Sequence, residues 1–245
     1  MQINGSVALV SGANRGIGRS FVEALLARGA AKVYAGARQP ERLADLVDAG
    51  KGRLVPLKLD ITQPADIAAA AGRCRDVTLL VNNAGINLQA GLIAAHDLAA
   101  ARAEMETNYF GPLAMCRAFA PILQGNGGGA VINMLSILAR VNLPMYGSLS
   151  ASKAAALSLT QGVRAELATH GTLVVAVMPG AVDTEMERNF PPPKLAPAEV
   201  ARAALDAVEQ GAEEVYPGDM ASGMSQGLAA DAKAVEKDLA KYLPA

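Results

Sequence analysis

The 245-residue chain contains no tryptophan, and phenylalanine and tyrosine together make up only 4% of it. So few aromatic side chains do not provide a stacking surface for nucleic-acid bases. The 22 basic and 23 acidic residues are interspersed and give a formal net charge of −1, which creates no sustained field to attract a polyanion or an anionic membrane. We therefore expect neither nucleic acid nor a membrane as a partner, and favour a small molecule bound at a local site.

Cysteine and long apolar runs are also scarce. Cys74 and Cys116 are the only cysteines and lack the paired spacing of a metal site or a redox motif, so we expect two buried, reduced thiols and no metal. No stretch reaches the roughly 18 uninterrupted apolar residues of a membrane helix, and MQINGSVALVSG at the start does not resemble a signal peptide. These absences predict a cytoplasmic protein, and the length suits a single domain over 1–245.

Apolar runs and amphipathic stretches alternate along the chain. Seven runs rich in Val, Ile and Leu are typical of strands buried on both faces: 7–12, 32–37, 53–60, 77–85, 130–136, 172–180 and 213–218. The amphipathic stretches long enough for helices are 17–28, 41–49, 64–73, 98–123, 150–170 and 197–210. The alternation predicts an α/β fold, with a doubly wound parallel sheet of about seven strands and helices on both faces.

Two segments near the end stand apart from this alternation. The rigid stretch FPPPKLAP at 190–197 follows the sixth predicted strand, close to the edge where open α/β sheets bind ligands. It is either a surface connection or the border of a substrate lid over 184–198. The tail, 219–245, mixes Gly, Met, Asp and Lys, and predicts one polar helix over 228–242 with no readable role.

A glycine-rich turn follows the first predicted strand. SGANRGIG at 11–18 places Gly12, Gly16 and Gly18 between a strand and a helix. Missing Cβ atoms let the backbone approach a pyrophosphate there, and the start of the helix offers free N–H groups. The spacing G-x-x-x-G-x-G is a weak signal by itself, so its meaning depends on the motifs that follow.

Further motifs follow in a specific order: NNAG at 82–85, Ser136, Lys153 and PG at 179–180. With the glycine-rich turn, they make the sequence from about residue 5 to 218 resemble the short-chain dehydrogenase/reductase family. The resemblance implies a Rossmann-type domain that binds a nicotinamide dinucleotide, with the substrate above the carboxyl edge of the sheet.

The resemblance also assigns roles to residues around the cofactor. Asp60 would contact the adenine amino group, and NNAG would line the cofactor and steady the central sheet. In PGAVDT at 179–184, Val182 and Thr184 would hold the carboxamide. The complete set of implied cofactor-binding residues is Gly12, Asn14, Arg15, Gly16, Ile17, Gly18, Arg38, Asp60, Ile61, Asn82, Ala84, Gly85, Lys153, Pro179, Gly180, Val182 and Thr184.

Charge at the end of the second predicted strand indicates which dinucleotide binds. An acidic residue there would accept hydrogen bonds from the ribose 2′-OH, whereas arginine attracts a 2′-phosphate. The strand ends AGARQP, so Ala37 stands at the acidic position and Arg38 follows it. Arg15 precedes Gly16, so two cations can converge on the phosphate. The sequence predicts NADPH.

Catalysis in the family depends on an Asn, a Ser, a Tyr and a Lys, and the resemblance places three of these at Asn108, Ser136 and Lys153. Leu149 stands where the tyrosine proton donor should be, one helical turn before Lys153. An alkyl side chain cannot transfer a proton. Losing a general acid typically lowers the rate by about 10²- to 10⁴-fold.

An apolar pocket is predicted beside these residues. Tyr146 is expected in the loop before the helix, as a wall residue and not as a substitute acid. The predicted pocket residues are Leu138, Leu143, Met145, Tyr146, Met186 and Phe190.

Three functions remain open. The first is an NADPH-dependent carbonyl reductase or alcohol dehydrogenase for small apolar ketones or alcohols, crippled or altered by Leu149. The second is a non-catalytic NADPH-binding interaction or sensing protein, against which the retained Asn108, Ser136 and Lys153 count. The third is an imine or iminium reductase, whose charged substrate needs no tyrosine acid. The family further implies a homodimer or homotetramer assembled through 98–123 and 150–170.

Overall fold

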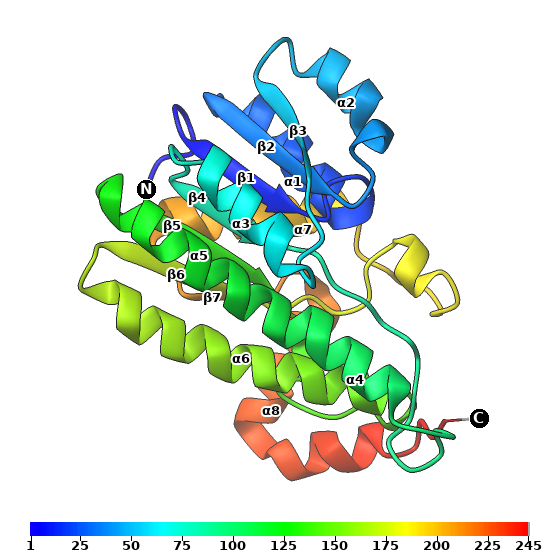
Figure 1. Cartoon of the computed structure of the whole chain (residues 1–245). Coiled ribbons are helices and arrows are strands. Elements are labelled where there is room, and N and C mark those ends of the chain that lie inside the picture. Colours follow the sequence, from blue (N-terminus) through cyan, green and yellow to red (C-terminus); the bar gives the residue numbers. More distant parts are fainter. Residues whose placement is uncertain (245) are drawn as a thin grey trace.

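The computed structural model describes residues 1–244 and contains a seven-stranded parallel sheet with helices on both faces (Figure 1). Its strands are β1 (Val7–Ser11), β2 (Lys32–Ala37), β3 (Leu54–Lys58), β4 (Leu79–Asn82), β5 (Gly129–Met134), β6 (Thr172–Val177) and β7 (Glu214–Val215). All six neighbouring pairs are parallel. The predicted fold class is confirmed.

Two helical layers cover the sheet (Figure 1). One consists of α1 (Gly16–Ala27), α2 (Ala44–Ala49) and α7 (Pro197–Gln210). The other contains α3 (Pro64–Arg73), α5 (Gly111–Gly125) and α6 (Gly147–Ala168). The helix α4 (Ala99–Met105) runs into α5 through a π-helical turn, Glu106–Phe110. The helix α8 (Gly218–Leu239) lies beside the N-terminal half of α6 (Figure 1).

The apolar strands supply both cores because successive side chains point to opposite faces. In β1, Leu9 packs with the α3–α5–α6 layer, whereas Ala8 and Val10 pack with the α1–α2–α7 layer. Phe119 and Phe21 are the largest fully buried side chains of the two layers. Burying one such side chain contributes about 1.5–3 kcal/mol, so the two cores hold the strand ends in fixed positions.

The order of the strands, β3-β2-β1-β4-β5-β6-β7, reverses direction between β1 and β4. Open α/β sheets bind ligands outside the carboxyl ends of their strands at such a switch point. In this chain the glycine-rich turn follows β1 and the NNAG segment follows β4. The fold therefore brings the two predicted cofactor motifs to one crevice.

Several element boundaries differ from the expected ones. The run at 213–218 forms only the two-residue β7, and the polar helix expected at 228–242 is α8, which begins ten residues earlier and ends at Leu239. Non-helical Asp231 breaks α8, and its Oδ1 accepts hydrogen bonds from the N–H groups of Lys233 and Ala234, both at 3.0 Å. This side chain caps the second half of α8. None of the helices in residues 1–244 is long and apolar enough to cross a membrane.

Candidate active site

The glycine-rich turn forms a tight backbone cradle at the start of α1. Gly12 and Gly16 have φ values of +66° and +52°, in the left-handed region that favours glycine. A Cβ on Gly18 would lie 2.1 Å from the Gly12 carbonyl oxygen, so α1 packs directly on the turn. No side chain caps the N-terminus of α1 and its first turn holds no acidic residue. The free N–H groups fit an anion such as a pyrophosphate.

Hydrogen bonds from Ser11 join the β1 turn to the β4 turn. Its Oγ accepts from the N–H groups of Asn83 and Ala84 at 3.0 and 3.1 Å, and Asn83 Nδ2 donates to the Ser11 carbonyl at 2.9 Å. Neither Ser11 nor Asn83 was among the predicted site residues, although Asn83 lies within the NNAG motif. They fix the floor of the crevice between β1 and β4.

Asn82 braces the sheet through buried hydrogen bonds. Its Nδ2 donates to Asn133 Oδ1 at 2.9 Å, and Asn133 Nδ2 donates in turn to Thr160 Oγ1 at 2.9 Å. All three side chains are buried. The predicted steadying role of NNAG fits this chain of bonds, and contact of Asn82, Ala84 and Gly85 with a cofactor stays a prediction.

The predicted adenine side contains Asp60 and Ile61, directly after β3. Asp60 Oδ1 accepts from Thr62 N–H at 3.0 Å and from Thr62 Oγ1 at 2.7 Å, which fixes the carboxylate at the sheet edge. Ile61 is buried, and its side chain would lie 2.6 Å from a Cβ on Gly111. Ile61 thus anchors the loop in the core behind the crevice.

The two arginines predicted to hold a 2′-phosphate differ in their surroundings. Arg38 is exposed immediately after β2 and forms no ion pair with any of the described residues. Arg15 instead pairs with Glu185, on the loop that follows β6. Of these two arginines, only Arg38 lacks an ion pair among the described residues, and the convergence of both cations on the phosphate stays a prediction. Asn14 and Ile17 lie half-buried in the turn beside Arg15.

Two of the predicted catalytic residues, Asn108 and Lys153, converge around Gly85. A Cβ on Gly85 would lie 3.1 Å from Asn108 Oδ1 and 3.6 Å from Lys153 Nζ. Asn108 comes from the π-helical turn, where its Oδ1 accepts from Ile86 N–H and its Nδ2 donates to the Ile86 carbonyl and to Ser152 Oγ, each at 2.9 Å. Asn108 therefore fastens the segment after β4 to α6.

Lys153 is buried beside this arrangement. Its Nζ donates to the Met134 carbonyl at 2.8 Å. Burial lowers the pKa of Lys153 to about 8, while the Glu104 carboxylate acts in the opposite direction. Ser136 lies just beyond β5, and its Oγ accepts from Leu138 N–H at 3.2 Å. One Ser136 lone pair is thereby used, and its proton remains for donation.

Leu149 belongs to a small apolar cluster separate from the two main cores. Its buried members are Leu143, Tyr146 and Leu149, and Leu138, Met145, Phe190 and Leu239 pack against them. Five of the six predicted pocket residues are therefore brought together. Met186 is not one of them, because the 3₁₀ turn Glu185–Glu187 leaves its side chain 42% exposed. Tyr146 lies in a 3₁₀ turn, Pro144–Tyr146, and not in an open loop.

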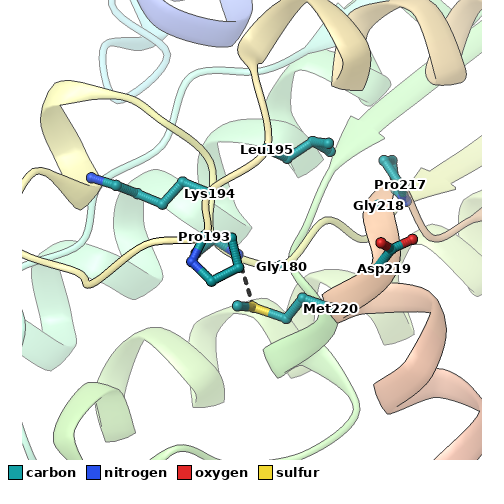
Figure 2. Close-up of a pocket in the computed structure, with 9 residues that line it drawn as sticks. Gly180, Pro193, Lys194, Leu195, Pro217, Gly218, Asp219 and Met220 are labelled. Carbon is teal, nitrogen blue, oxygen red and sulfur yellow. Dashed lines mark hydrogen bonds between the residues drawn. The ribbon is translucent and has the colours of Figure 1, made fainter.

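The predicted nicotinamide-side loop is held by α8, as Figure 2 shows. Met220 Sδ accepts from Ala181 N–H at 3.3 Å, and a Cβ on Gly180 would lie 2.7 Å from that sulfur. A cavity of about 150 Å³ is lined by these residues together with the 193–195 segment and Pro217 (Figure 2). Met220 was missed because nothing local marks it.

The same loop also approaches the glycine-rich turn. A Cβ on Gly16 would lie 3.2 Å from Thr184 Cγ2, and Thr184 N–H donates to the Val182 carbonyl at 2.8 Å. Pro179 contributes its carbonyl to Ile137 N–H at 2.9 Å. The predicted lid, 184–198, is fixed at both ends, since Val182 bridges Leu195. Among residues 1–244, no group of His, Cys, Asp and Glu side chains is arranged to hold a metal ion.

Comparisons with known proteins give consistent matches. The family model described as short chain dehydrogenase matches residues 6–194. A short chain dehydrogenase from Burkholderia cenocepacia J2315, solved in complex with NADP, is 57% identical with a TM-score of 0.93, over 98% of this chain and 99% of that one. The bulky-bulky ketone specific alcohol dehydrogenase from Comamonas testosteroni is 25% identical with a TM-score of 0.78, over 95% and 94%. An uncharacterized oxidoreductase from Staphylococcus saprophyticus is 32% identical, over 86% of this chain and 94% of the relative.

Proposed function

The chain belongs to the short-chain dehydrogenase family, and from that premise we propose that it is an NADPH-dependent carbonyl reductase or alcohol dehydrogenase acting on small apolar ketones or alcohols, with its chemistry altered by Leu149. The observation that carries the proposal is the convergence of Asn108 and Lys153 on Gly85, next to an apolar cluster. The bulky-bulky ketone specific alcohol dehydrogenase from Comamonas testosteroni supports a ketone or alcohol as the substrate, but not its small size.

The cradle supports NADPH as the cofactor. A dinucleotide fits a turn in which Gly12 and Gly16 keep the backbone bare and the start of α1 offers uncapped N–H groups. Arg38 would bind the 2′-phosphate, and the 57% identical relative was solved with NADP. When bound, the nicotinamide supplies a hydride to the substrate.

The residues around the apolar cluster give unequal help to a carbonyl substrate. Ser136 offers its hydroxyl proton to the carbonyl oxygen, because Leu138 N–H already occupies one of its lone pairs. Lys153 holds a positive charge near the crevice at neutral pH, since its pKa is about 8. Leu149 offers neither a proton nor a hydrogen bond. The developing oxyanion is therefore poorly stabilised, and ketone reduction is slow.

We expect NADPH to bind at least tenfold more tightly than NADH, which requires about 1.4 kcal/mol. Fluorescence titration measures both affinities. Arg38→Ala should remove most of the preference, whereas Arg15→Ala should remove less, because Arg15 is paired with Glu185. Equal affinities in the parent chain, or a full preference in Arg38→Ala, would contradict the proposed cofactor site.

A second candidate function is a non-catalytic NADPH-binding protein, which the missing acid at Leu149 favours. Ser136 counts against it, because its hydroxyl proton is left available for a carbonyl substrate and a binding protein has no use for that group. Ketone turnover by Leu149→Tyr separates the two candidates.

We also propose that the chain forms a homodimer or homotetramer through α4 and the neighbouring long helices. Exposed apolar side chains support this: Leu98 is 62% exposed and Phe110 48%, and both line a groove that also includes Met105. Sedimentation analysis of the chain and of a Phe110→Glu variant tests the interface, because a charge there should favour monomers. The cytoplasmic location stays a prediction.

A further inference from the structure

Glu187 lies at the edge of the apolar cluster with an unusual set of partners. Its Oε1 accepts from Asn87 Nδ2 at 3.1 Å, and the Tyr146 hydroxyl lies next to the carboxyl group. Burial raises the pKa of Glu187, and burial together with Glu187 raises the pKa of Tyr146. Both neighbours of the carboxyl group are neutral.

Cations near Glu187 are bound elsewhere. Lys194 Nζ donates to the Glu187 main-chain carbonyl at 3.1 Å and lies 3.5 Å from Asp183 Oδ1. It therefore acts on the Glu187 carboxylate by longer-range electrostatic attraction and not by a direct ion pair. Arg15 and Arg188 both pair with Glu185. Within residues 1–244, no Lys, Arg or His nitrogen lies within 4 Å of a Glu187 carboxylate oxygen. The carboxylate of half-buried Glu187 thus has neutral hydrogen-bonding partners and no ion pair, and a bound cation would offset the cost of its partial burial.

Asn87, the hydrogen-bond partner of this carboxylate, lies two residues after Gly85, where Asn108 and Lys153 converge. Tyr146, which Glu187 contacts, belongs to the same cluster as Leu149, and Leu149 occupies the place of the family's proton donor. Phe190, three residues after Glu187, packs on that cluster. The apolar cluster therefore has no acid at 149 and a carboxylate beside Tyr146.

We propose that Glu187 binds a positively charged nitrogen of the substrate, and that the site accordingly takes cyclic iminium ions in preference to ketones. This assignment rests on the proposed NADPH-dependent function. Hydride adds to the iminium carbon, the C=N π pair becomes the nitrogen lone pair, and the product is a neutral amine. No proton is transferred in that step, so Leu149 is sufficient.

Glu187 should act mainly on binding. Hydride transfer neutralises the iminium, so the carboxylate stabilises the bound cation at least as well as the transition state. Loss of the charge at 187 is therefore expected to raise KM and to leave kcat within about twofold. The ammonium of Lys153 opposes a cation, and the Glu104 carboxylate near it reduces this repulsion.

The test compares the parent chain with Glu187→Gln, which keeps the shape of the side chain, and with Glu166→Gln, which removes a charge at an exposed position on α6. The substrates are an N-methyl pyrrolinium ion and cyclopentanone, at saturating NADPH. We expect Glu187→Gln to raise KM for the pyrrolinium ion about tenfold and for cyclopentanone less than twofold, with no change in Glu166→Gln. Equal changes for both substrates would overturn the proposal.

Two further measurements test cation binding by Glu187 independently of the proposed catalytic function. Isothermal titration of protonated N-methylpyrrolidine measures cation binding without turnover, and Glu187→Gln should weaken that binding about tenfold. If neither substrate is reduced but this loss is seen, the proposed catalysis fails and the assignment of Glu187 stands. Tyr146→Phe should retain the cation preference; its loss there would show that the hydroxyl, and not the charge, recognises the ligand.

Discussion

Replacing Leu149 by tyrosine restores the one group that the family's catalytic set lacks. Residues 149 and 153 lie one turn apart on α6, so the new hydroxyl would stand near the Lys153 ammonium. A positioned general acid typically gives about 10²- to 10⁴-fold in rate, which corresponds to about 2.7–5.5 kcal/mol of transition-state stabilisation. We expect kcat for cyclopentanone reduction to increase within that range.

The substitution also carries a structural cost. Leu149 is 6% exposed and packs against Tyr146 and Leu143, so a larger ring must displace its neighbours. Overpacking of this kind costs about 1–3 kcal/mol, or roughly 2–4 °C of Tm per kcal/mol for a chain of this size. NADPH affinity should stay nearly unchanged, because the glycine-rich turn after β1 contributes no residue to this cluster.

The assay follows NADPH oxidation from pH 6 to pH 10, with Leu149→Phe as the matched control that adds the ring without the hydroxyl. The gain in ketone reduction by Leu149→Tyr should be present below the Lys153 pKa of about 8 and decline above it. Above that pH the ammonium group of Lys153 is lost, and with it the charge that lowers the pKa of the new tyrosine and makes it a stronger proton donor. If Leu149→Phe raises ketone reduction equally, or if Leu149→Tyr stays inactive with NADPH bound, the reasoning about the missing acid is refuted.

Two further predictions concern the cradle and the buried lysine. Gly18→Ala places a Cβ 2.1 Å from the Gly12 carbonyl oxygen, so it should lower NADPH affinity at least tenfold and the free energy of unfolding by at least about 2 kcal/mol. The control Gly162→Ala, with nothing within 4 Å of its Cβ at an exposed position, should instead stabilise α6 by up to about 1 kcal/mol. NADPH titration and urea unfolding measure these effects, and a Gly18→Ala variant that changes neither quantity would contradict the packing described. The pKa of Lys153 is lowered from 10.5 to about 8 in the folded chain, so between these pH values the unfolded chain binds more protons, and the contribution of Lys153 to the free energy of unfolding should rise with pH by up to about 3 kcal/mol. Urea unfolding of the parent chain and of Lys153→Met should give a difference in free energy of unfolding that rises across this pH window. A difference that does not change with pH would mean that the lysine is not desolvated.

The arrangement of strands and helices was predictable because it depends on local apolar patterns. Runs such as VALVS and TLVVAV are largely buried on both faces, and such continuous apolar runs are typical of strands inside a parallel sheet. The start of α8 was not predictable, because Gly218–Leu239 has little apolar periodicity and is held partly by Met220 on Ala181, a contact set by the fold. Of the site, the convergence of Asn108 and Lys153 followed from the resemblance.

Contacts between distant parts of the sequence account for what sequence reasoning missed. Arg15 has an acidic partner 170 residues away, and Asn87 lies 100 residues before Glu187. The local sequence TEMER is typical of an exposed surface turn, and only the folded chain turns one of its two glutamates toward Tyr146. Long-range pairing of polar side chains leaves no periodic signal in a single sequence.

The π-helical turn Glu106–Phe110 constrains how this sequence can diverge. A π turn holds about one more residue than an α turn, so deleting a residue would let α4 and α5 merge while rotating one against the other by about 100°. Asn108 would then lose its hydrogen bonds to Ile86 and Ser152, or the exposed apolar side chains near Leu98 would rotate to a different face of the helix. Substitutions can accumulate along this helix independently, but a change of length at 106–110 alters the inner and the outer surface in a single evolutionary event.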